Sequence, residues 1–378
     1  MTRPAPMHLL MTVNAAWNLV NFRRGLVAAL LDDGHRLTVL APRDESADTL
    51  EEMGCRVVDL PMDNKGVSPL RNLALLWRLW RRMGQDRPDA VLGYTIKNNI
   101  FGALAARARG IPVVPNVTGL GTAFLSGRRL QRLVEALYRH AFARAPVVFF
   151  QNQDDCDLFL RLGLVTAGQA RVLPGSGIDT SAFAPEPMPS HAADEPVFLM
   201  IARVLRDKGV EEFVTAARTI RARHPRAVFR LLGPLGAENR SAIPPETVHA
   251  WQDEGVIDYS GTAPDVRPHI ARADCVVLPS YREGMPRTLL EAAAMARPVI
   301  ATDVPGCREA LVEGQTGLLC RARDGASLAE ACARFIALPS DSRAAMGLAG
   351  RARIERQFDQ DLVIATYREV VQQLGGHQ

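Results

Sequence analysis

The chain has 378 residues and a formal net charge of +4, with 47% hydrophobic and 23% charged residues. This is ordinary globular composition, and the length is sufficient for two domains. No run approaches eighteen apolar residues, and the first twenty contain no small-residue cleavage site, so we expect neither a membrane-spanning helix nor a signal peptide.

Six cysteines are scattered along the chain without the paired spacing of a metal site. We expect them to be buried free thiols in a reducing compartment. They are Cys55, Cys156, Cys275, Cys307, Cys320 and Cys332.

Short apolar strands alternate with amphipathic helical patterns from the beginning of the chain. Strands are expected at 8–13, 36–41, 56–60, 90–94, 113–117 and 147–150, and the first is followed by a helix that reaches Leu31. This alternation predicts a parallel sheet that helices cover on both faces.

The first half is also strongly basic between Lys65 and Arg144, where fourteen Lys or Arg residues are set against three acidic ones. A basic face of this kind suggests an anionic lipid, a diphosphate-bearing acceptor or nucleic acid as partner. A merely solvated surface would explain it as well.

Segment 70–83 of this stretch reads as a basic amphipathic helix. It combines an apolar face with a stripe of arginines: Leu70, Leu73, Leu76, Trp77, Trp80 and Met83 against Arg71, Arg78, Arg81 and Arg82. Such helices lie in the interfacial plane of a membrane, so we expect this one, with a second basic helix over 128–144, to bind an anionic membrane surface. The alternative is that the apolar stripe packs on the sheet, as in every helix of a doubly wound domain.

Residues 173–196 carry five prolines and few apolar residues, and no regular element fits them. We interpret this segment as the linker between an acceptor-binding domain over 1–188 and a donor domain over 189–359. The C-terminal helix, about 360–378, can pack back on the first domain.

After the linker the alternation restarts. Strands are expected at 197–201, 228–232, 256–259, 275–278 and 299–301, and helices at 210–223, 326–336, 342–357 and 362–374. The fold class is therefore α/β, with two Rossmann-like doubly wound parallel sheets facing a cleft, and ligands are expected at the carboxyl ends of the strands.

The segment SYREGMPRTLLE, over 280–291, concentrates the chemistry of the second half. It follows a strand and begins a helix near Pro286, preceded by Gly284, so the helix start presents backbone N–H groups and a dipole that attract phosphate. Glu283 lies just before this helix and Glu291 two turns into it, so the two carboxylates should hold different hydroxyl-rich parts of one ligand. A nucleotide sugar fits that description.

A second cluster follows the strand at 197–201, where Arg203 and Lys208 precede Gly209. Two cations at the start of a helix suggest a diphosphate clamp, and the strand order should bring them into the same cleft as Gly284. On their own they would be a solvated helix start.

Two glycine pairs are weaker signals. Gly119 and Gly121 resemble a dinucleotide loop, but the third glycine and the acidic residue of that fingerprint are missing. Gly233 and Gly236 follow a strand and could let a nucleotide approach the backbone, although an ordinary turn explains them equally well.

Taken in order, Arg203 and Lys208, then SYREGMPRTLLEA with its two glutamates seven residues apart, then PVIATDVPGCREALVEGQTGLL resemble the retaining glycosyltransferases of family 4, which have GT-B architecture. The resemblance spans nearly the whole chain. Through YTIKNN at 94–99 and NVTGLGTAF at 116–124, the first half is similar to the branch that adds N-acetylhexosamine to undecaprenyl-diphosphate-linked saccharides.

The resemblance implies a role for each matching donor-site residue. Arg203 and Lys208 would bind the donor diphosphate, and Glu291 the ribose hydroxyls. Glu283, with the backbone of Gly284, Met285 and Pro286, would bind the sugar and phosphate, and Gly233 would lie beside the nucleotide. Catalysis would rest on Glu283, Arg203 and Lys208, with no metal and no cofactor beyond the UDP-sugar donor.

The resemblance also implies acceptor contacts in the first domain, at Lys97, Asn116, Thr118 and Gly119. This chain departs from many relatives in having Asn14, Ala15 and Ala16 in place of a glycine pair, and in lacking a histidine near 117–119. Arg297 stands where many relatives have glycine, and the sequence suggests no role for it.

The expected activity is transfer of an N-acetylhexosamine or hexose from a UDP-sugar to a lipid-diphosphate-linked saccharide, in the assembly of bacterial surface polysaccharide or glycoprotein glycan. The enzyme would be cytoplasmic, peripherally bound to the inner face of the membrane, with no nucleic-acid partner. A nucleotide-sugar epimerase of similar shape, a non-catalytic membrane-surface binder, an inverting transferase and a transferase with a soluble acceptor are the alternatives.

Overall fold

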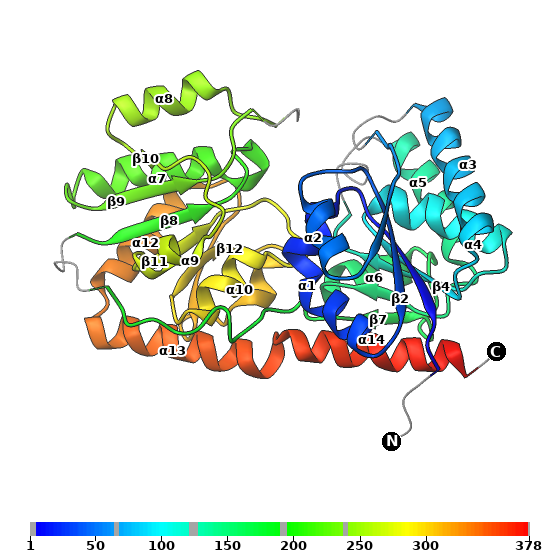
Figure 1. The fold of residues 1–378 in the computed structure, drawn as a ribbon. Helices are drawn as coiled ribbons and strands as arrows, with labels where there is room; N and C mark the ends of the chain where they lie inside the picture. The colour runs from blue at the N-terminus through cyan, green and yellow to red at the C-terminus, as the bar shows by residue number, and fades with distance from the viewer. Residues whose placement is uncertain (1–4, 64–67, 121–127, 190–194, 237–240, 377–378) are drawn as a thin grey trace. The chain divides into compact units, whose positions relative to one another are not determined.

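The computed structural model describes residues 5–63, 68–120, 128–189, 195–236 and 241–376, and the chain divides into two compact units (Figure 1). One unit comprises Met1–Gly177 with Gln360–Gln378, and the other comprises Ile178–Asp359. The change of unit falls inside the expected linker but ahead of the expected boundary at 188. The reason is that Ile178 already pairs with the second unit, since its N–H donates to the carbonyl of Phe358 at 2.8 Å.

The sheet of the first unit has seven parallel strands in the order β3-β2-β1-β4-β5-β6-β7. They are β1 (His8–Thr12), β2 (Arg36–Ala41), β3 (Arg56–Asp59), β4 (Ala90–Tyr94), β5 (Val113–Val117), β6 (Val148–Phe150) and β7 (Ala170–Val172). The strand order reverses between β1 and β4. In doubly wound sheets, ligands bind at the carboxyl edge beside such a switch point.

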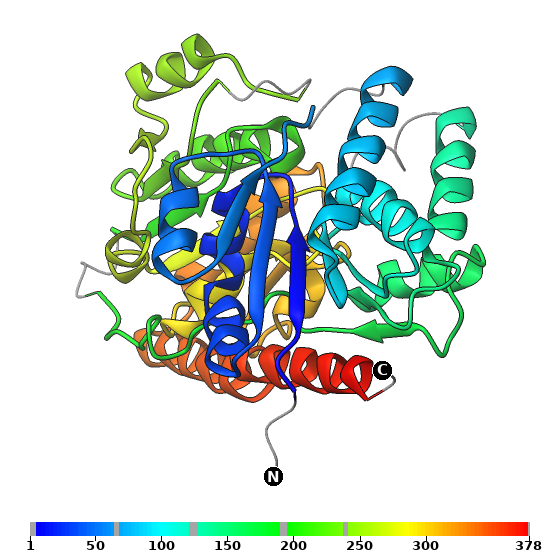
Figure 2. The ribbon, with the colours of Figure 1, turned by 45° about the vertical axis from the view of Figure 1, so that its right-hand side comes forward.

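Helices cover both faces of this sheet because alternate strand residues point to opposite sides. Leu9 and Met11 of β1 pack with one helical layer, and Leu10 packs with the other. The first layer contains α1 (Ala16–Asp32), α2 (Ser46–Glu52) and α14 (Gln360–Gly375). The second contains α3 (Pro69–Asp86), η1 (Asn98–Gly102), α4 (Ala103–Ala108), α5 (Arg128–Phe142) and α6 (Gln153–Arg161). Figure 2 shows α3, in light blue, beside α4, which in turn contacts α5.

The C-terminal helix α14 belongs to the first unit. It buries Tyr367, whose ring lies 4.8 Å from that of Phe149. At its surface, Arg368 donates twice to the carboxylate of Asp33, at 2.6 and 2.9 Å. The last helix of the chain therefore completes the apolar layer that α1 and α2 begin.

The sheet of the second unit has six parallel strands in the order β10-β9-β8-β11-β12-β13. They are β8 (Val197–Ile201), β9 (Val228–Leu232), β10 (Asp258–Tyr259), β11 (Cys275–Leu278), β12 (Val299–Thr302) and β13 (Gly317–Cys320). The order reverses between β8 and β11, so this unit repeats the arrangement of the first and has its own switch point.

Two helical layers cover the second sheet as well. Phe198 and Met200 of β8 face one layer, and Leu199 faces the other. The first layer contains α7 (Val210–Arg221), α8 (Pro245–Asp253) and α12 (Gly325–Ala337). The second contains α9 (Arg267–Ala271), α10 (Arg287–Ala294), α11 (Cys307–Ala310) and α13 (Ser340–Gln357). All six cysteines of the chain are buried free thiols, as expected.

Arg297, for which the sequence suggested no role, is fully buried in the second unit. Its guanidinium donates to five backbone carbonyls at 2.7 to 3.3 Å: those of Glu186, Pro187, Ile270, Ala271 and Met295. Burial lowers the pKa of Arg297. The side chain thus links residues 186–187, at the beginning of the second unit, to α9 and to the end of α10 through hydrogen bonds.

Candidate active site

The loops that follow β8 and β11 meet at the carboxyl edge of the second sheet, on either side of its switch point. The N–H of Tyr281, after β11, donates to the carbonyl of Asp207 at 3.0 Å. The hydroxyl of Thr288, in the first turn of α10, donates to the carbonyl of Ile201 at 3.2 Å. The two clusters that the sequence singled out are therefore neighbours in one unit.

Lys208 and Glu283 form an ion pair between these loops. Nζ of Lys208 lies 2.5 Å from Oε1 of Glu283, and the two side chains are 22% and 14% exposed. Lys208 ends the short 3-10 turn η3 (Arg206–Lys208), which is closed by Gly209 at φ +77°. A Cβ on Gly209 would lie 2.1 Å from the carbonyl oxygen of Pro279, so only glycine lets the two loops approach this closely.

Arg203 lies in the same loop as Lys208 but is exposed. Within the described residues, its guanidinium takes part in no hydrogen bond or ion pair. It can therefore turn toward an anion at the carboxyl edge without first breaking an interaction.

Helix α10 begins beside the ion pair, with Pro286 as its N-cap residue. The first turn of a helix carries the positive end of its dipole and directs its backbone N–H groups outward, and here the N–H of Leu289 donates to the carbonyl of Pro286 at 3.1 Å. Gly284 and Met285 are half-buried, and Pro286 is buried. The predicted anion-binding helix start thus lies next to the predicted cations.

Glu291 is buried on the second turn of α10, with only 9% of its surface exposed. Its Oε1 accepts from Nε of Arg287 at 2.6 Å. Burial raises the pKa of Glu291, and the neighbouring Arg287 cation opposes that rise. The sequence did not identify Arg287 as the partner of Glu291, although their spacing of four residues on a helix was a usable signal.

Gly233 is expected to lie beside the nucleotide, but the packing of the protein itself already requires glycine at this position. Its φ is +155°, and a Cβ there would lie 1.8 Å from the carbonyl oxygen of Ala202. Its own carbonyl accepts from the hydroxyl of Tyr259 at 2.9 Å. The backbone that approaches Gly233 is thus that of the loop after β8, and a donor contact at Gly233 stays a prediction.

The carboxyl edge of the first sheet contains a strained residue that sequence reasoning missed. Thr95, directly after β4, has φ +68°, a conformation that a β-branched residue rarely adopts. The buried side chain of Asn98 donates to the hydroxyl of Thr95 at 3.0 Å and accepts from that of Thr12 at 2.6 Å. The following turn, η1, is a π-helix, a form that is frequent at functional sites.

Lys97 belongs to the same edge. Its Nζ donates to the carbonyl of Asp63, and burial lowers its pKa. Thr118 and Gly119 follow β5 and are half-buried, with Gly119 at φ +140°. Gly121 lies outside the described residues.

Asn116 requires a correction, because it is a core residue and not an accessible acceptor contact. Only 1% of its surface is exposed. Its Nδ2 donates to the hydroxyl of Tyr367 at 2.9 Å, and its carbonyl accepts from Nδ2 of Asn99 at 2.7 Å. Asn116 therefore joins β5 to α14 and to η1.

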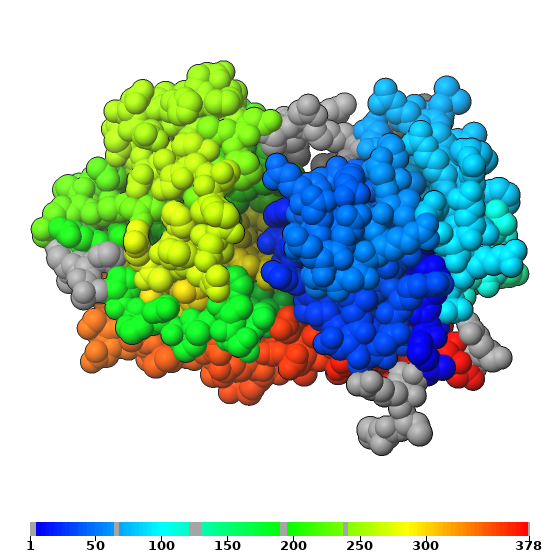
Figure 3. All heavy atoms as spheres, in the orientation of Figure 1, coloured from blue at the N-terminus to red at the C-terminus, as the bar shows by residue number. Residues whose placement is uncertain are grey.

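Helix α3 carries two apolar stripes. Leu75, Leu79 and Met83 are buried against the sheet, so Met83 belongs to the core and not to the outer face. The outer residues remain exposed: Leu70 by 80%, Leu73 by 63%, Trp77 by 54% and Trp80 by 38%. In the space-filling view, α3 lies at the surface of the first unit, in light blue (Figure 3). Packing on the sheet therefore does not account for the outer stripe.

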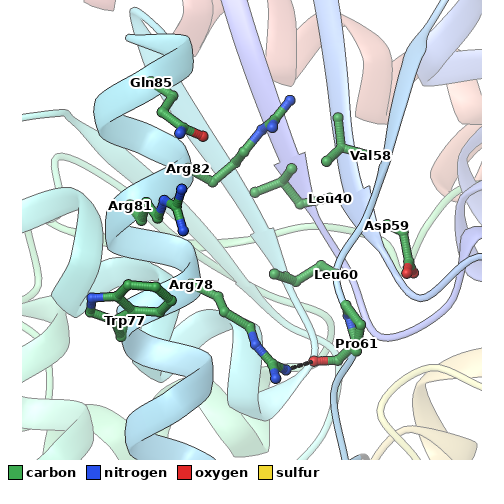
Figure 4. Close-up of a pocket in the computed structure, with 10 residues that line it drawn as sticks. All are labelled: Leu40, Val58, Asp59, Leu60, Pro61, Trp77, Arg78, Arg81, Arg82 and Gln85. Atoms are coloured by element: carbon green, nitrogen blue, oxygen red, sulfur yellow. Dashed lines mark hydrogen bonds between the residues drawn. The ribbon is translucent and has the colours of Figure 1, made fainter.

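Three arginines of α3, Arg78, Arg81 and Arg82, line a pocket of about 400 Å³ between this helix and the ends of β2 and β3 (Figure 4). Nη1 of Arg78 donates to the carbonyl of Pro61 at 2.7 Å, and the guanidinium of Arg81 lies 5.4 Å from the centre of the Trp77 ring. Nε of Arg82 bonds to Asp86 at 2.7 Å. Three cations thus border one hollow of the first unit.

Two further properties of the described residues concern membrane spans and metal sites. None of the helices in these ranges is both long enough and apolar enough to cross a membrane. Within the same ranges, no three or more His, Cys, Asp or Glu side chains are grouped so that they could hold a metal ion.

Residues 20–175 match the family described as glycosyl transferase 4-like domain, and residues 195–337 match the family described as glycosyl transferases group 1. One relative is the N,N'-diacetylbacillosaminyl-diphospho-undecaprenol alpha-1,3-N-acetylgalactosaminyltransferase of Campylobacter jejuni. It is 27% identical over 370 residues, which cover 94% of this chain and 95% of that protein.

Solved structures agree on the fold. Sucrose-phosphate synthase from Thermosynechococcus elongatus superimposes with a TM-score of 0.80 at 19% identity, over 98% of this chain and 100% of that one. HepE of Anabaena, in complex with UDP-glucose, gives a TM-score of 0.78 at 19% identity, over 97% and 99% of the two chains. These neighbours show that the fold is GT-B, and the two domain matches show that the chain belongs to the glycosyltransferases, as an enzyme with a 4-like domain and a group 1 domain.

Proposed function

We propose that this glycosyltransferase moves an N-acetylhexosamine or hexose, with retention of configuration, from a UDP-sugar to a saccharide carried on a lipid diphosphate. The observation that carries the proposal is the convergence of Lys208, Glu283 and the start of α10 at one switch point. A cation, a carboxylate and a helix N-terminus together suit a substrate that joins a diphosphate to hydroxyl-rich groups.

The donor would span the carboxyl edge of the second unit. Glu291 would accept hydrogen bonds from the ribose hydroxyls, while Arg203 and the first turn of α10 would hold the diphosphate. An ammonium group has three N–H donors, so Lys208 can bond to Glu283 and still donate to a phosphate oxygen. The second carboxylate oxygen of Glu283 would accept from a hydroxyl of the sugar.

The chemical step breaks the bond between the anomeric carbon and the diphosphate oxygen and forms a bond to the acceptor oxygen on the same face. The acceptor proton passes to the leaving phosphate oxygen. Negative charge grows on the diphosphate during this step, and Arg203, Lys208 and the α10 dipole would stabilise it, so the proposed mechanism needs no metal.

The first unit would bind the acceptor. The Campylobacter jejuni relative is named for a diphospho-undecaprenol acceptor, which supports a lipid-linked saccharide here. The switch point of the first sheet, with Lys97, strained Thr95 and the residues after β5, is where the saccharide would bind. We further propose that the outer stripe of α3 and its arginines rest on the inner face of the membrane that holds this lipid.

Incubation with radiolabelled UDP-N-acetylgalactosamine and a bacterial lipid extract tests the proposal. A lipid-linked acceptor predicts that label moves into the organic phase. An epimerase would instead leave a labelled, water-soluble UDP-sugar of changed configuration, and a non-catalytic binder would leave the donor unchanged. Label in a water-soluble saccharide would point to a soluble acceptor. The anomeric configuration of the product decides between retention and inversion.

A further inference from the structure

We propose that the turn over 303–306, between β12 and α11, together with the start of α11, is a positioning element of the donor site. In this proposal, Gly306 and Glu309 determine where the carboxylate of Glu283 lies and thereby how well the transferred sugar is recognised. The inference rests on the proposed function, because it takes Glu283 to be the residue that contacts the sugar.

The turn touches the backbone of Glu283 directly. The N–H of Glu283 donates to the carbonyl of Pro305 at 3.2 Å. Gly306 has φ +82°, and a Cβ on it would lie 2.6 Å from the carbonyl oxygens of both Glu283 and Gly284. No side chain fits at Gly306 while those two carbonyls keep their positions, because real Cβ contacts are not that short.

A carboxylate holds the turn in this shape. Oε2 of Glu309 accepts from the N–H of Gly306 at 2.7 Å. The carbonyl of Glu309 accepts in turn from Nη2 of Arg353, on α13, at 2.7 Å. Glu309 therefore connects the turn at Gly306 to α13 in the helical layer of the second unit.

The loop that carries Glu283 also contacts β12 at the end where the loop leaves β11. The hydroxyl of Thr302, the last residue of β12, donates to the carbonyl of Ser280. Between these contacts, the N–H of Tyr281 donates to the carbonyl of Asp207, and the side chain of Glu283 extends to Lys208. The position of the Glu283 carboxylate therefore depends on β12 and its turn, as well as on the loop after β8.

This arrangement predicts a larger effect at the sugar end of the donor than at its nucleotide end. Glu291, assigned to the ribose, is held by α10 and Arg287, and Arg203 lies in the loop after β8. Within the described residues, neither forms a hydrogen bond or an ion pair with Gly306 or Glu309. Lys208, which would also meet the diphosphate, does pair with Glu283, so a shifted turn should weaken recognition of the sugar more than recognition of the nucleotide diphosphate.

The test compares equilibrium binding of UDP and of UDP-N-acetylgalactosamine to the full-length protein, by calorimetry. Gly306→Ala and Glu309→Ala should each weaken UDP-N-acetylgalactosamine binding about tenfold, which corresponds to about 1.4 kcal/mol, with a clearly smaller loss of UDP binding. Glu309→Gln should restore sugar binding, because its amide oxygen can still accept from the Gly306 N–H. Glu330→Ala is the matched control, since Glu330 is an exposed carboxylate on α12.

Two outcomes would overturn the inference: wild-type affinity for both ligands in Glu309→Ala, or a parallel loss for both ligands that Glu309→Gln does not restore. If Gly306→Ala fails to fold, the two Glu309 variants decide alone. Glu283→Ala distinguishes a failure of the role proposed for Glu283 from a failure of the role proposed for the turn. Unchanged UDP-N-acetylgalactosamine affinity in that variant refutes the proposed role of Glu283, whereas a loss there with no loss in the Gly306 and Glu309 variants refutes only the role of the turn.

Discussion

Lys208 and Glu283 are separated by 75 positions in the chain, yet their side chains meet at 2.5 Å. The contact joins the loops after β8 and β11, the two strands that flank the switch point of the second sheet. Both side chains are mostly shielded from water, so their charges interact more strongly than those of a surface pair. The site that we assign to the donor is organised around this pair.

Replacement of Lys208 by alanine should lower turnover more than donor binding. If Lys208 stabilises charge that grows in the transition state, kcat should fall about 100-fold or more while the donor KM changes little. Steady-state kinetics with varied donor measures both constants. Arg206→Ala is the matched control, because Arg206 lies two residues away but pairs with Glu211. A variant that raises only the KM would reassign Lys208 to ground-state binding.

As the pH is lowered, donor binding should begin to weaken at a higher pH than it would if Glu291 had the pKa of an ordinary glutamate. Burial raises the pKa of Glu291, so its carboxylate takes up a proton earlier as the pH falls. If the ionised form binds the ribose, donor affinity should be constant above the raised pKa and should decline as the pH falls through it. Titration of donor affinity against pH measures this.

Two variants control that titration. Glu291→Gln should bind the donor about tenfold more weakly and lose the pH dependence, because it has no carboxylate to protonate. Arg287→Ala removes the cation that opposes the rise, so the decline should begin at a still higher pH. An unchanged pH profile in Glu291→Gln would show that another group titrates.

Removal of divalent metal should not stop the reaction. Arg203, Lys208 and the start of α10 supply positive charge at the diphosphate, which is the role that a metal plays in other transferases. Initial rates with excess EDTA should equal those in its absence. A sharp loss that magnesium restores would contradict the metal-free mechanism while leaving the donor site in place.

Arg297 should be essential for stability but not for the chemistry. Arg297→Met keeps much of the volume but removes a fully buried guanidinium together with its hydrogen bonds to five backbone carbonyls, so unfolding should become easier by about 3 kcal/mol or more. Urea denaturation measures the change. Arg334→Met, which breaks one exposed ion pair with Glu313, should cost less than about 1 kcal/mol. Equal costs for the two variants would contradict the role of Arg297.

The outer face of α3 should bind anionic liposomes. Each arginine near an anionic surface contributes about 1 kcal/mol, so changing Arg78, Arg81 and Arg82 to glutamate should abolish sedimentation with such liposomes. High salt should release the wild type, because the attraction is electrostatic. The control changes three arginines of the second unit to glutamate: Arg223, Arg226 and Arg334. Wild-type protein that stays in the supernatant at low salt would rule out this surface.

Much of the fold could be predicted from periodicity alone. The bounds of β2, β4, β5, β8, β9 and β11 are those predicted, because buried parallel strands are short uninterrupted apolar runs. The edge strands β7 and β13 were not predicted. β7 has only three residues, among them exposed Val172, so neither burial nor alternation marks it in the sequence.

The site shows the same division. The sequence could place Lys208 and Glu283 near strand ends because each lies only a few residues after an apolar run that is recognisable as a strand. Their pairing, the Arg287 partner of Glu291 and the burial of Asn116 under Tyr367 depend on how distant segments pack. The strain at Thr95 depends on its backbone conformation, which no residue type in YTIKNN signals.

The most direct test of the central claim is the rate at which radiolabel passes from UDP-N-acetylgalactosamine into the lipid phase, in wild type and in Glu283→Ala. A thermal unfolding profile like that of wild type would establish that the variant is folded. If the Lys208 and Glu283 site performs the transfer, wild type moves label into the organic phase and Glu283→Ala moves it about 100-fold more slowly. Equal rates in the two proteins would contradict the account.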